Sequence, residues 1–255
     1  GAIAKPTTSS SSSSPSPSPS PAEKERLDYQ AVLLETAALL LSSTLPPIVE
    51  IAASLPPLAA GLGQLLQTVL AAKLKHPRLI SLHAEVIEAF RCLLPLRPDL
   101  VMPAVGACLE NMSLIPIPEG SGQAPPPVPA PPFWRLGFEA RLSMANAVLG
   151  LAKACPSTVA AHLPDIVTRI AMMWQSGQLR HGELVLLHEG VMTAATNGGC
   201  GADVTTQLVH AIFAPVAEAW TSPTWRAKIA TPQAFLQAFL PLESAGGVGG
   251  VGGSG

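Results

Sequence analysis

The sequence predicts an all-α protein built as a HEAT-like solenoid, an α-α superhelix of stacked helical hairpins, with disordered tails at both ends. Ala and Leu dominate a chain that is 48% hydrophobic and only 4% aromatic, a composition that favours helices over strands. Apolar residues recur with a period near 3.6, and helix follows helix without a strand pattern between them. Prolines within successive helical segments also recur at a spacing close to that of HEAT repeats.

Three stretches of biased composition are expected to lie outside the helical core. Residues 1–21 are dominated by Ser and Pro, and residues 243–255 by Gly. Such tracts bury too little apolar surface to offset the entropy of ordering, so disorder is expected. Residues 116–132, rich in Pro and Ala, are expected to form a surface loop or flexible insertion. The helical repeats are then expected in residues 22–115 and 133–242.

Four full helices are expected in the first half, over residues 22–42, 58–74, 78–94 and 99–112. Ser20 and Pro21 suit the cap and first position of the first helix. The proline pairs at 46–47 and 56–57 are expected to break the chain after it, leaving at best a short helix over residues 48–54. The third helix has an apolar stripe of Leu79, Leu82, Val86, Phe90 and Leu93.

The second half predicts further helices over residues 134–154, 157–175, 182–196 and 203–221, and a shorter one over 232–240. The cleanest stripe belongs to residues 157–175 and consists of Val159, Leu163, Ile166, Val167, Ile170 and Trp174. The helix over 203–221 has Val209, Phe213, Val216 and Trp220 on one side. We expect that side to pack, and burial of Trp220 would make Trp220→Ala cost about 3–5 kcal/mol.

The spacing of three prolines supports repeats. Pro103, Pro164 and Pro215 are interpreted as lying in the second helix of successive pairs. Their separations are about 44 residues, once the insertion is removed, and about 51, against about 40–47 in HEAT repeats. The competing architecture is an ordinary helical bundle. In a solenoid each pair buries only its neighbours, so long surfaces stay free for partners.

Charge and hydropathy argue against two broad classes of protein, uniformly basic nucleic-acid binders and membrane-spanning proteins. A net charge of −2 argues against a uniformly basic nucleic-acid binder, although a local basic patch is compatible with it. The longest uncharged stretch, residues 51–72, is long enough to raise the question of a membrane span. Its prolines, glycines and glutamines favour a buried solenoid helix, so no membrane insertion is expected.

No motif for catalysis is present, and we expect neither an enzyme nor a cofactor or metal site. The sequence has no phosphate-binding glycine loop and no nucleophile elbow, and its six histidines form no H-E-x-x-H pair. The four cysteines form no C-x-x-C pair, and reduced thiols, three of them on apolar helix faces, are expected. Cys200, beside a glycine turn, is interpreted as a loop thiol.

One basic cluster is a candidate for RNA binding. Lys73, Lys75 and Arg78 gather with His76 at the predicted turn between two helices, where they could contact phosphate oxygens. The alternative is a solvated loop whose lysines favour a helix C-terminus. Two weaker candidates are the pairs Arg135 with Arg141 and Arg226 with Lys228.

Several passages together resemble a known family. Ala214, Pro215, Val216, Glu218 and Trp220 lead into Ser222, Pro223, Thr224 and Trp225, and Ala234–Leu236 follow. With residues 183–191, 97–103 and 65–70, this pattern is similar to exportin-5 and HASTY-type nuclear export receptors of the importin-β superfamily. The resemblance covers residues 27–242 with gaps. The Pro-rich insertion departs from it, because the family has a more charged linker there.

The resemblance implies a middle segment of a receptor that carries double-stranded small RNA, tRNA or other cargo from nucleus to cytoplasm with GTP-bound Ran. It implies shuttling between the two compartments and contact with nuclear pore proteins. The family's main Ran-binding repeats lie nearer the N-terminus of the receptor than this segment. The alternative from another class is a generic HEAT scaffold that binds proteins without RNA or Ran.

Overall fold

The computed structural model describes residues 21–52, 54–117 and 132–239, in which helices are joined by short turns and no strand is present. Most of the two predicted tails and of the insertion therefore lies outside the described residues. The helices are α1 (Pro21–Ala52), α2 (Pro56–Leu70), α3 (Pro77–Ala89), α4 (Val101–Leu114), α5 (Pro132–Ala154), α6 (Pro156–Ala160), α7 (Leu163–Gln175), α8 (His181–Asn197), α9 (Ala202–Thr221), α10 (Pro223–Ile229) and α11 (Pro232–Phe239). Two 3-10 turns, Leu94–Leu96 and Pro98–Leu100, join α3 to α4.

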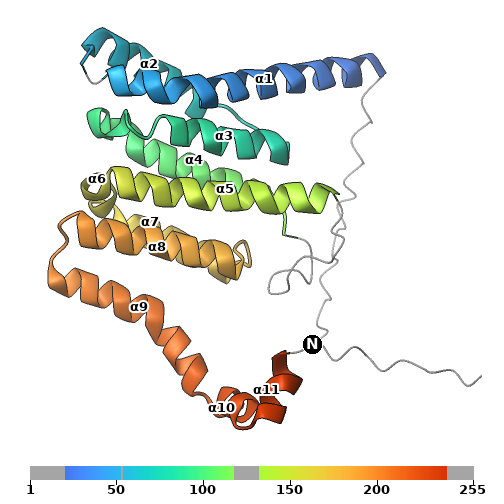
Figure 1. Cartoon of the computed structure of the whole chain (residues 1–255), viewed down its shortest axis with the longest axis vertical. Helices are drawn as coiled ribbons and strands as arrows, with labels where there is room; N and C mark the ends of the chain where they lie inside the picture. The colour runs from blue at the N-terminus through green and yellow to red at the C-terminus, as the bar shows by residue number, and fades with distance from the viewer. Residues whose placement is uncertain (1–20, 53, 118–131, 240–255) are drawn as a thin grey trace, which may run out of the picture.

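The helices stack in two layers, as Figure 1 shows. One layer consists of α1, α3, α5 and α8, which pack extensively against one another in that order. The second layer consists of α2, α4 and α6–α7, whose members make much weaker contact with one another. Because each element packs on its neighbours in line, the predicted HEAT-like solenoid is confirmed.

The core runs between the two layers from one helix pair to the next. Its fully buried side chains include Leu66 of α2, Ile80 of α3, Met144 of α5 and Leu187 of α8. The predicted stripe of α3 is buried apart from Leu79, which is half-buried. Apolar burial on this scale supplies the main stabilising term of the solenoid.

The predicted break at the first proline pair is wrong. Pro46 and Pro47 lie inside α1, which continues to Ala52. Each proline removes one backbone hydrogen bond, but Leu45 before them and Val49 and Ala52 beyond them all lie in the core. The apolar burial of these three residues keeps the chain helical through a sequence that local rules would interrupt.

Pro164 has the opposite effect and divides a predicted single helix into α6 and α7. It occupies the first turn of α7, where its missing N–H group leaves no bond unmade. Pro103 likewise lies in the first turn of α4. The interpretation that Pro103, Pro164 and Pro215 mark the second helix of successive pairs stays a prediction.

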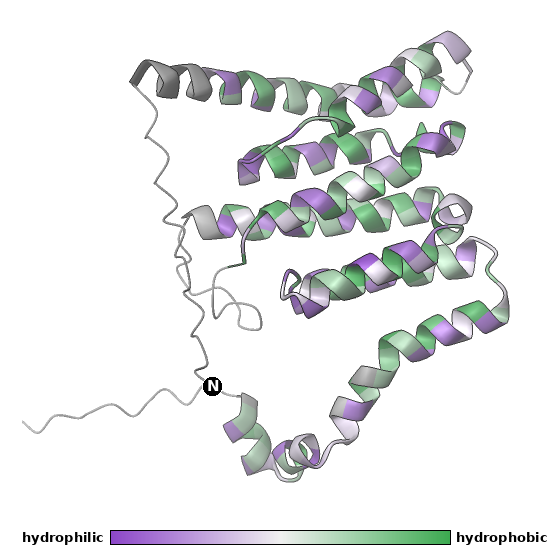
Figure 2. Cartoon of the chain, turned by 180° about the vertical axis from the view of Figure 1, so that it is seen from behind, coloured by the Kyte–Doolittle hydropathy of each residue, from purple (hydrophilic) through white to green (hydrophobic). Residues whose placement is uncertain are grey.

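The expected packing side of residues 203–221 is not covered. Val209, Phe213, Val216 and Trp220 of α9 are all exposed, and Trp220 retains 58% of its accessible surface. Figures 1 and 2 show α9, α10 and α11 diverging from the stack, with hydrophobic stretches on α9 and α11. The large stability cost expected for Trp220→Ala therefore does not follow. Helix α10 was not predicted, although the sequence Ser222-Pro223 is a good helix start.

Part of α1, Tyr29–Ala52, is long and apolar enough to cross a membrane by length and composition alone, with a mean hydropathy of 1.6. The sequence had raised this question for residues 51–72 instead, and the structure divides that stretch between α1 and α2. Helix α1 packs on α3 through one face and leaves the other uncovered. An end helix of a solenoid has this apolar character, and the absence of membrane insertion stays a prediction.

Candidate binding groove

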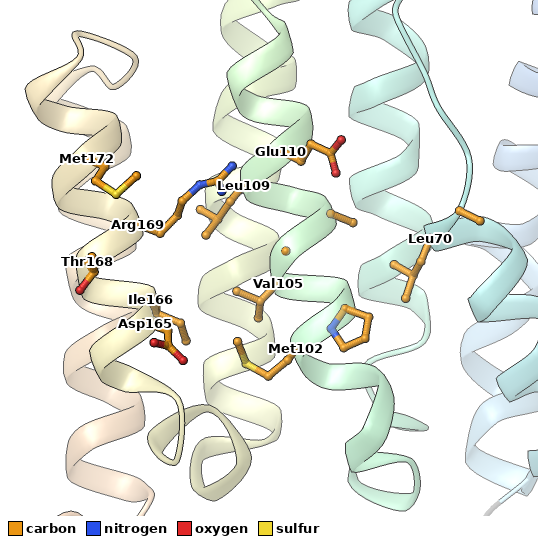
Figure 3. A pocket seen from close by; sticks show the side chains of 14 residues that line it. Leu70, Met102, Val105, Leu109, Glu110, Asp165, Ile166, Thr168, Arg169 and Met172 are labelled. Carbon is orange, nitrogen blue, oxygen red and sulfur yellow. The ribbon is translucent and has the colours of Figure 1, made fainter.

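A groove of about 920 Å³ lies in the more open layer of the solenoid. It lies between α4 and α7 and extends to the C-terminal end of α2 (Figure 3). The groove exists because these helices pack mainly on the other layer and leave space between themselves. Its apolar lining includes Leu70, Met102, Val105, Leu109, Ile166 and Met172.

Charged groups border this apolar lining on both walls. Asp165 and Arg169 stand on α7, and Glu110 stands on α4 (Figure 3). Asp165 and Arg169 lie four residues apart on α7, a spacing at which opposite charges on a helix can pair. Neither is in an ion pair within the described chain. An open apolar hollow with charged side chains at its edges is typical of a binding site.

A buried histidine fixes the wall on the α2 side. His83 of α3 donates from Nε2 to the carbonyl of Val69 at 2.8 Å, and its Nδ1 accepts from the Asn111 amide at 2.9 Å. These bonds join α2, α3 and α4 one residue away from Leu70 and Glu110 of the groove. Burial lowers the pKa of His83, against a smaller raising effect of the Val69 carbonyl, so the neutral ring is favoured.

A buried ion pair holds the C-terminal end of α4. Arg141 of α5 donates from Nε and Nη2 to both carboxylate oxygens of Glu183 at 2.8 and 2.7 Å, and both side chains are only 2% exposed. Its remaining donors reach the carbonyls of Met112, Ile115 and Gln178. The end of α4 and the turn after α7 are thus tied to α5 and α8.

The predicted RNA-binding residues do lie together at the turn between α2 and α3, but two of them already have acidic partners. Lys73 pairs with Glu110 at 3.0 Å, although it is 72% exposed, and Arg78 pairs with Glu35 at 3.1 Å. Lys75 is exposed and has no ion pair among the described residues. The assignment of RNA binding to Lys73, Lys75 and Arg78 stays a prediction.

The two weaker basic pairs have different outcomes. Arg141 is committed to the buried pair with Glu183, so its interpretation as a phosphate contact is wrong. Arg135 pairs with Glu139 at 2.9 Å on the same helix. Arg226 and Lys228 of α10 are exposed and form no ion pair in the described part of the chain.

The thiols and potential metal ligands give no sign of a reactive centre. Cys108 and Cys155 are buried, Cys200 is half-buried and Cys92 is exposed. Burial, followed by the nearby charge of Glu88, raises the pKa of Cys108 to about 12, which disfavours its reactive thiolate form. Within residues 21–52, 54–117 and 132–239, no three His, Cys, Asp or Glu residues are grouped so as to hold a metal ion.

Comparison with known proteins agrees with this architecture. The sequence model of the Exportin-5 family matches residues 7–245. Among curated proteins, Protein HASTY 1 of Arabidopsis thaliana is 24% identical over 162 residues, which is 64% of this chain and 12% of that protein. The chain thus spans only about an eighth of the relative's length. Because the family match extends over nearly the whole sequence, the chain belongs to the Exportin-5 family.

Proposed function

We propose that the chain is a segment of a nuclear export receptor that carries double-stranded small RNA, tRNA or other cargo with GTP-bound Ran. The receptor then shuttles between nucleus and cytoplasm. The family match over residues 7–245 is the observation that carries this proposal. The solenoid supports it, because curved helical stacks offer the extended surfaces that such cargo needs. The segment binds through shape and charge and catalyses no reaction.

Pull-down of the full-length receptor with a hairpin RNA tests this function. The RNA should be retained when Ran is locked with GTP and released when Ran carries GDP. Retention that is independent of Ran would overturn the export role. Contacts to RNA phosphates release counterions, so retention should also weaken steeply as salt rises.

The groove between α4 and α7 also favours a protein partner. We infer that this partner is a nuclear pore protein, because an export role requires contact with such proteins. A protein segment with apolar side chains suits the lining between α4 and α7. Met172→Glu places a charge in this lining, whereas Val185→Glu alters an exposed residue of α8 outside it. Loss of nuclear pore protein binding in Met172→Glu but not in Val185→Glu would support the assignment. Equal binding by both variants would contradict it.

A further inference from the structure

The turn between α9 and α10 combines the exposed ring of Trp220 and the half-buried ring of Trp225 with two cations. Trp220, near the end of α9, and Trp225 of α10 meet edge to face with their ring centroids 5.4 Å apart. The Nζ atom of Lys228 lies 5.5 Å from the centroid of the Trp225 ring. Ser222 caps α10, because its side chain accepts a hydrogen bond from the Trp225 backbone N–H at 3.2 Å. This bond holds the backbone at Trp225 in the first turn of α10.

The two cations of α10 differ from most other described basic residues because they have no carboxylate partner. Basic residues elsewhere, such as Lys73, Arg78 and Arg135, have carboxylate partners. Arg226 and Lys228 have none in the described chain and occupy the last turn of a short helix. Glu218 is the acidic residue nearest to them in the described sequence, so the turn keeps a local positive charge.

We infer that this turn binds a single-stranded stretch of RNA, with a base stacked on Trp220 and neighbouring phosphates held by Arg226 and Lys228. Unpaired bases stack on exposed aromatic rings, and nearby cations follow the backbone. The inference rests on the proposed RNA cargo and adds an unpaired-strand contact away from the Lys73 turn.

Charge distinguishes this occupant from a protein helix. A helix lying along α9 would cover Phe213 and Val216 as well as Trp220, because all three belong to one exposed apolar stripe. Arg226 and Lys228 stand only at the Trp220 end of that stripe. An RNA strand therefore needs Trp220 and the cations but not Phe213.

Tryptophan fluorescence of the chain tests the inference directly. A ten-nucleotide oligouridylate is titrated into a Trp134→Phe/Trp174→Phe variant, in which Trp220 and Trp225 are the remaining tryptophans. Saturable quenching is expected, and an RNA duplex without unpaired ends should not reproduce it. Trp220→Ala should weaken binding about 5- to 150-fold, measured with a dye-labelled oligonucleotide, whereas Trp220→Phe should retain it.

The charges are tested in the same assay. Two phosphate contacts give a slope of about −1.4 for log K against log salt, and Arg226→Gln/Lys228→Gln should remove most of that slope. Lys153→Gln removes an exposed cation of α5, and Phe213→Ala shortens the same stripe, so both should bind like the parent. Circular dichroism checks that each variant stays folded.

The inference would be overturned if the oligonucleotide caused no quenching or if the duplex caused equal quenching. It would also be overturned if Phe213→Ala lost as much binding affinity as Trp220→Ala. The binding assay contains no Ran, so its result is separable from the test of export. If the oligonucleotide quenches the fluorescence but the Ran-dependent pull-down fails, the RNA contact is supported and the transport role is not. A successful pull-down without quenching would leave the transport role and remove this contact.

Discussion

Arg141 has a role that its exposed counterparts cannot share. It brings a positive charge into the core, where Glu183 and three carbonyl oxygens satisfy its donors. Removing one partner of a buried pair leaves the other charge without compensation. A single side chain thus joins α5 to α8, to the end of α4 and to the turn after α7.

Arg141→Met should therefore lower the free energy of unfolding by about 3–5 kcal/mol. Arg135→Met is the matched control, since Arg135 pairs with Glu139 on the surface and such pairs contribute about 0–1 kcal/mol. Urea denaturation of both variants gives the comparison. Equal losses of stability would show that burial of the Arg141–Glu183 pair has no special weight.

His83 makes stability depend on pH. Its pKa is lowered in the folded chain, so the unfolded chain binds a proton more readily than the folded one. Its contribution to stability is thus present above about pH 6.5 and is lost as pH falls below that value. Half-buried His188 has a pKa shifted in the same direction by burial.

Replacing His83 by Gln should reduce this pH dependence. Gln can donate to Val69 and accept from Asn111 but does not titrate. Between pH 7.5 and 5.5 the parent should lose more stability than His83→Gln, by up to about 1.4 kcal/mol per pH unit. Urea denaturation at the two pH values measures the difference, and parallel losses in both proteins would exclude His83 as the source.

At the scale of elements, the turn between α8 and α9 depends on backbone contact. Helix α8 ends at Asn197, and Gly199 just after it has a φ of +81°. Gly198 lies directly against the α6 region, where an added Cβ would overlap the Pro156 carbonyl and the Ala160 side chain. The sequence indicates the turn, but the close approach follows only from the packing of α6 on α8.

Gly198→Ala should lower the free energy of unfolding by about 1–3 kcal/mol, because backbone atoms on both sides leave no room for the methyl group. Gly201→Ala is the control, since a Cβ there meets nothing within 4 Å. Thermal denaturation by circular dichroism measures both. A Gly198→Ala variant as stable as Gly201→Ala would mean that α6 and α8 do not approach so closely.

At the scale of the whole molecule, the ends of the stack differ from its middle. Exposed apolar residues concentrate on α1 and α9, whereas the faces between α3, α5 and α8 are buried. Each helix pair of a solenoid covers the previous one, so the first and last faces are left bare unless something packs on them. Bare faces of this size promote association between molecules.

The chain on its own should therefore self-associate as its concentration rises. Leu33→Glu/Leu40→Glu places two charges on the bare face of α1, where both leucines are exposed, and should reduce the association. Ser43→Glu/Thr44→Glu adds the same charge at exposed polar positions of the same helix. Sedimentation velocity compares the variants, and an equal effect of both double substitutions would point to net charge rather than the apolar face.

Local composition and short-range periodicity are enough to predict the all-α class, the stacking of helices and most helix positions, and the resemblance of several passages indicates the family. Tertiary structure alone decided that α1 passes through Pro46 and Pro47, that Arg141 is buried and that Trp220 is exposed. The physical reason is the same in all three cases. Periodicity shows which residues share a helix face, but only the position of neighbouring helices determines whether that face is covered.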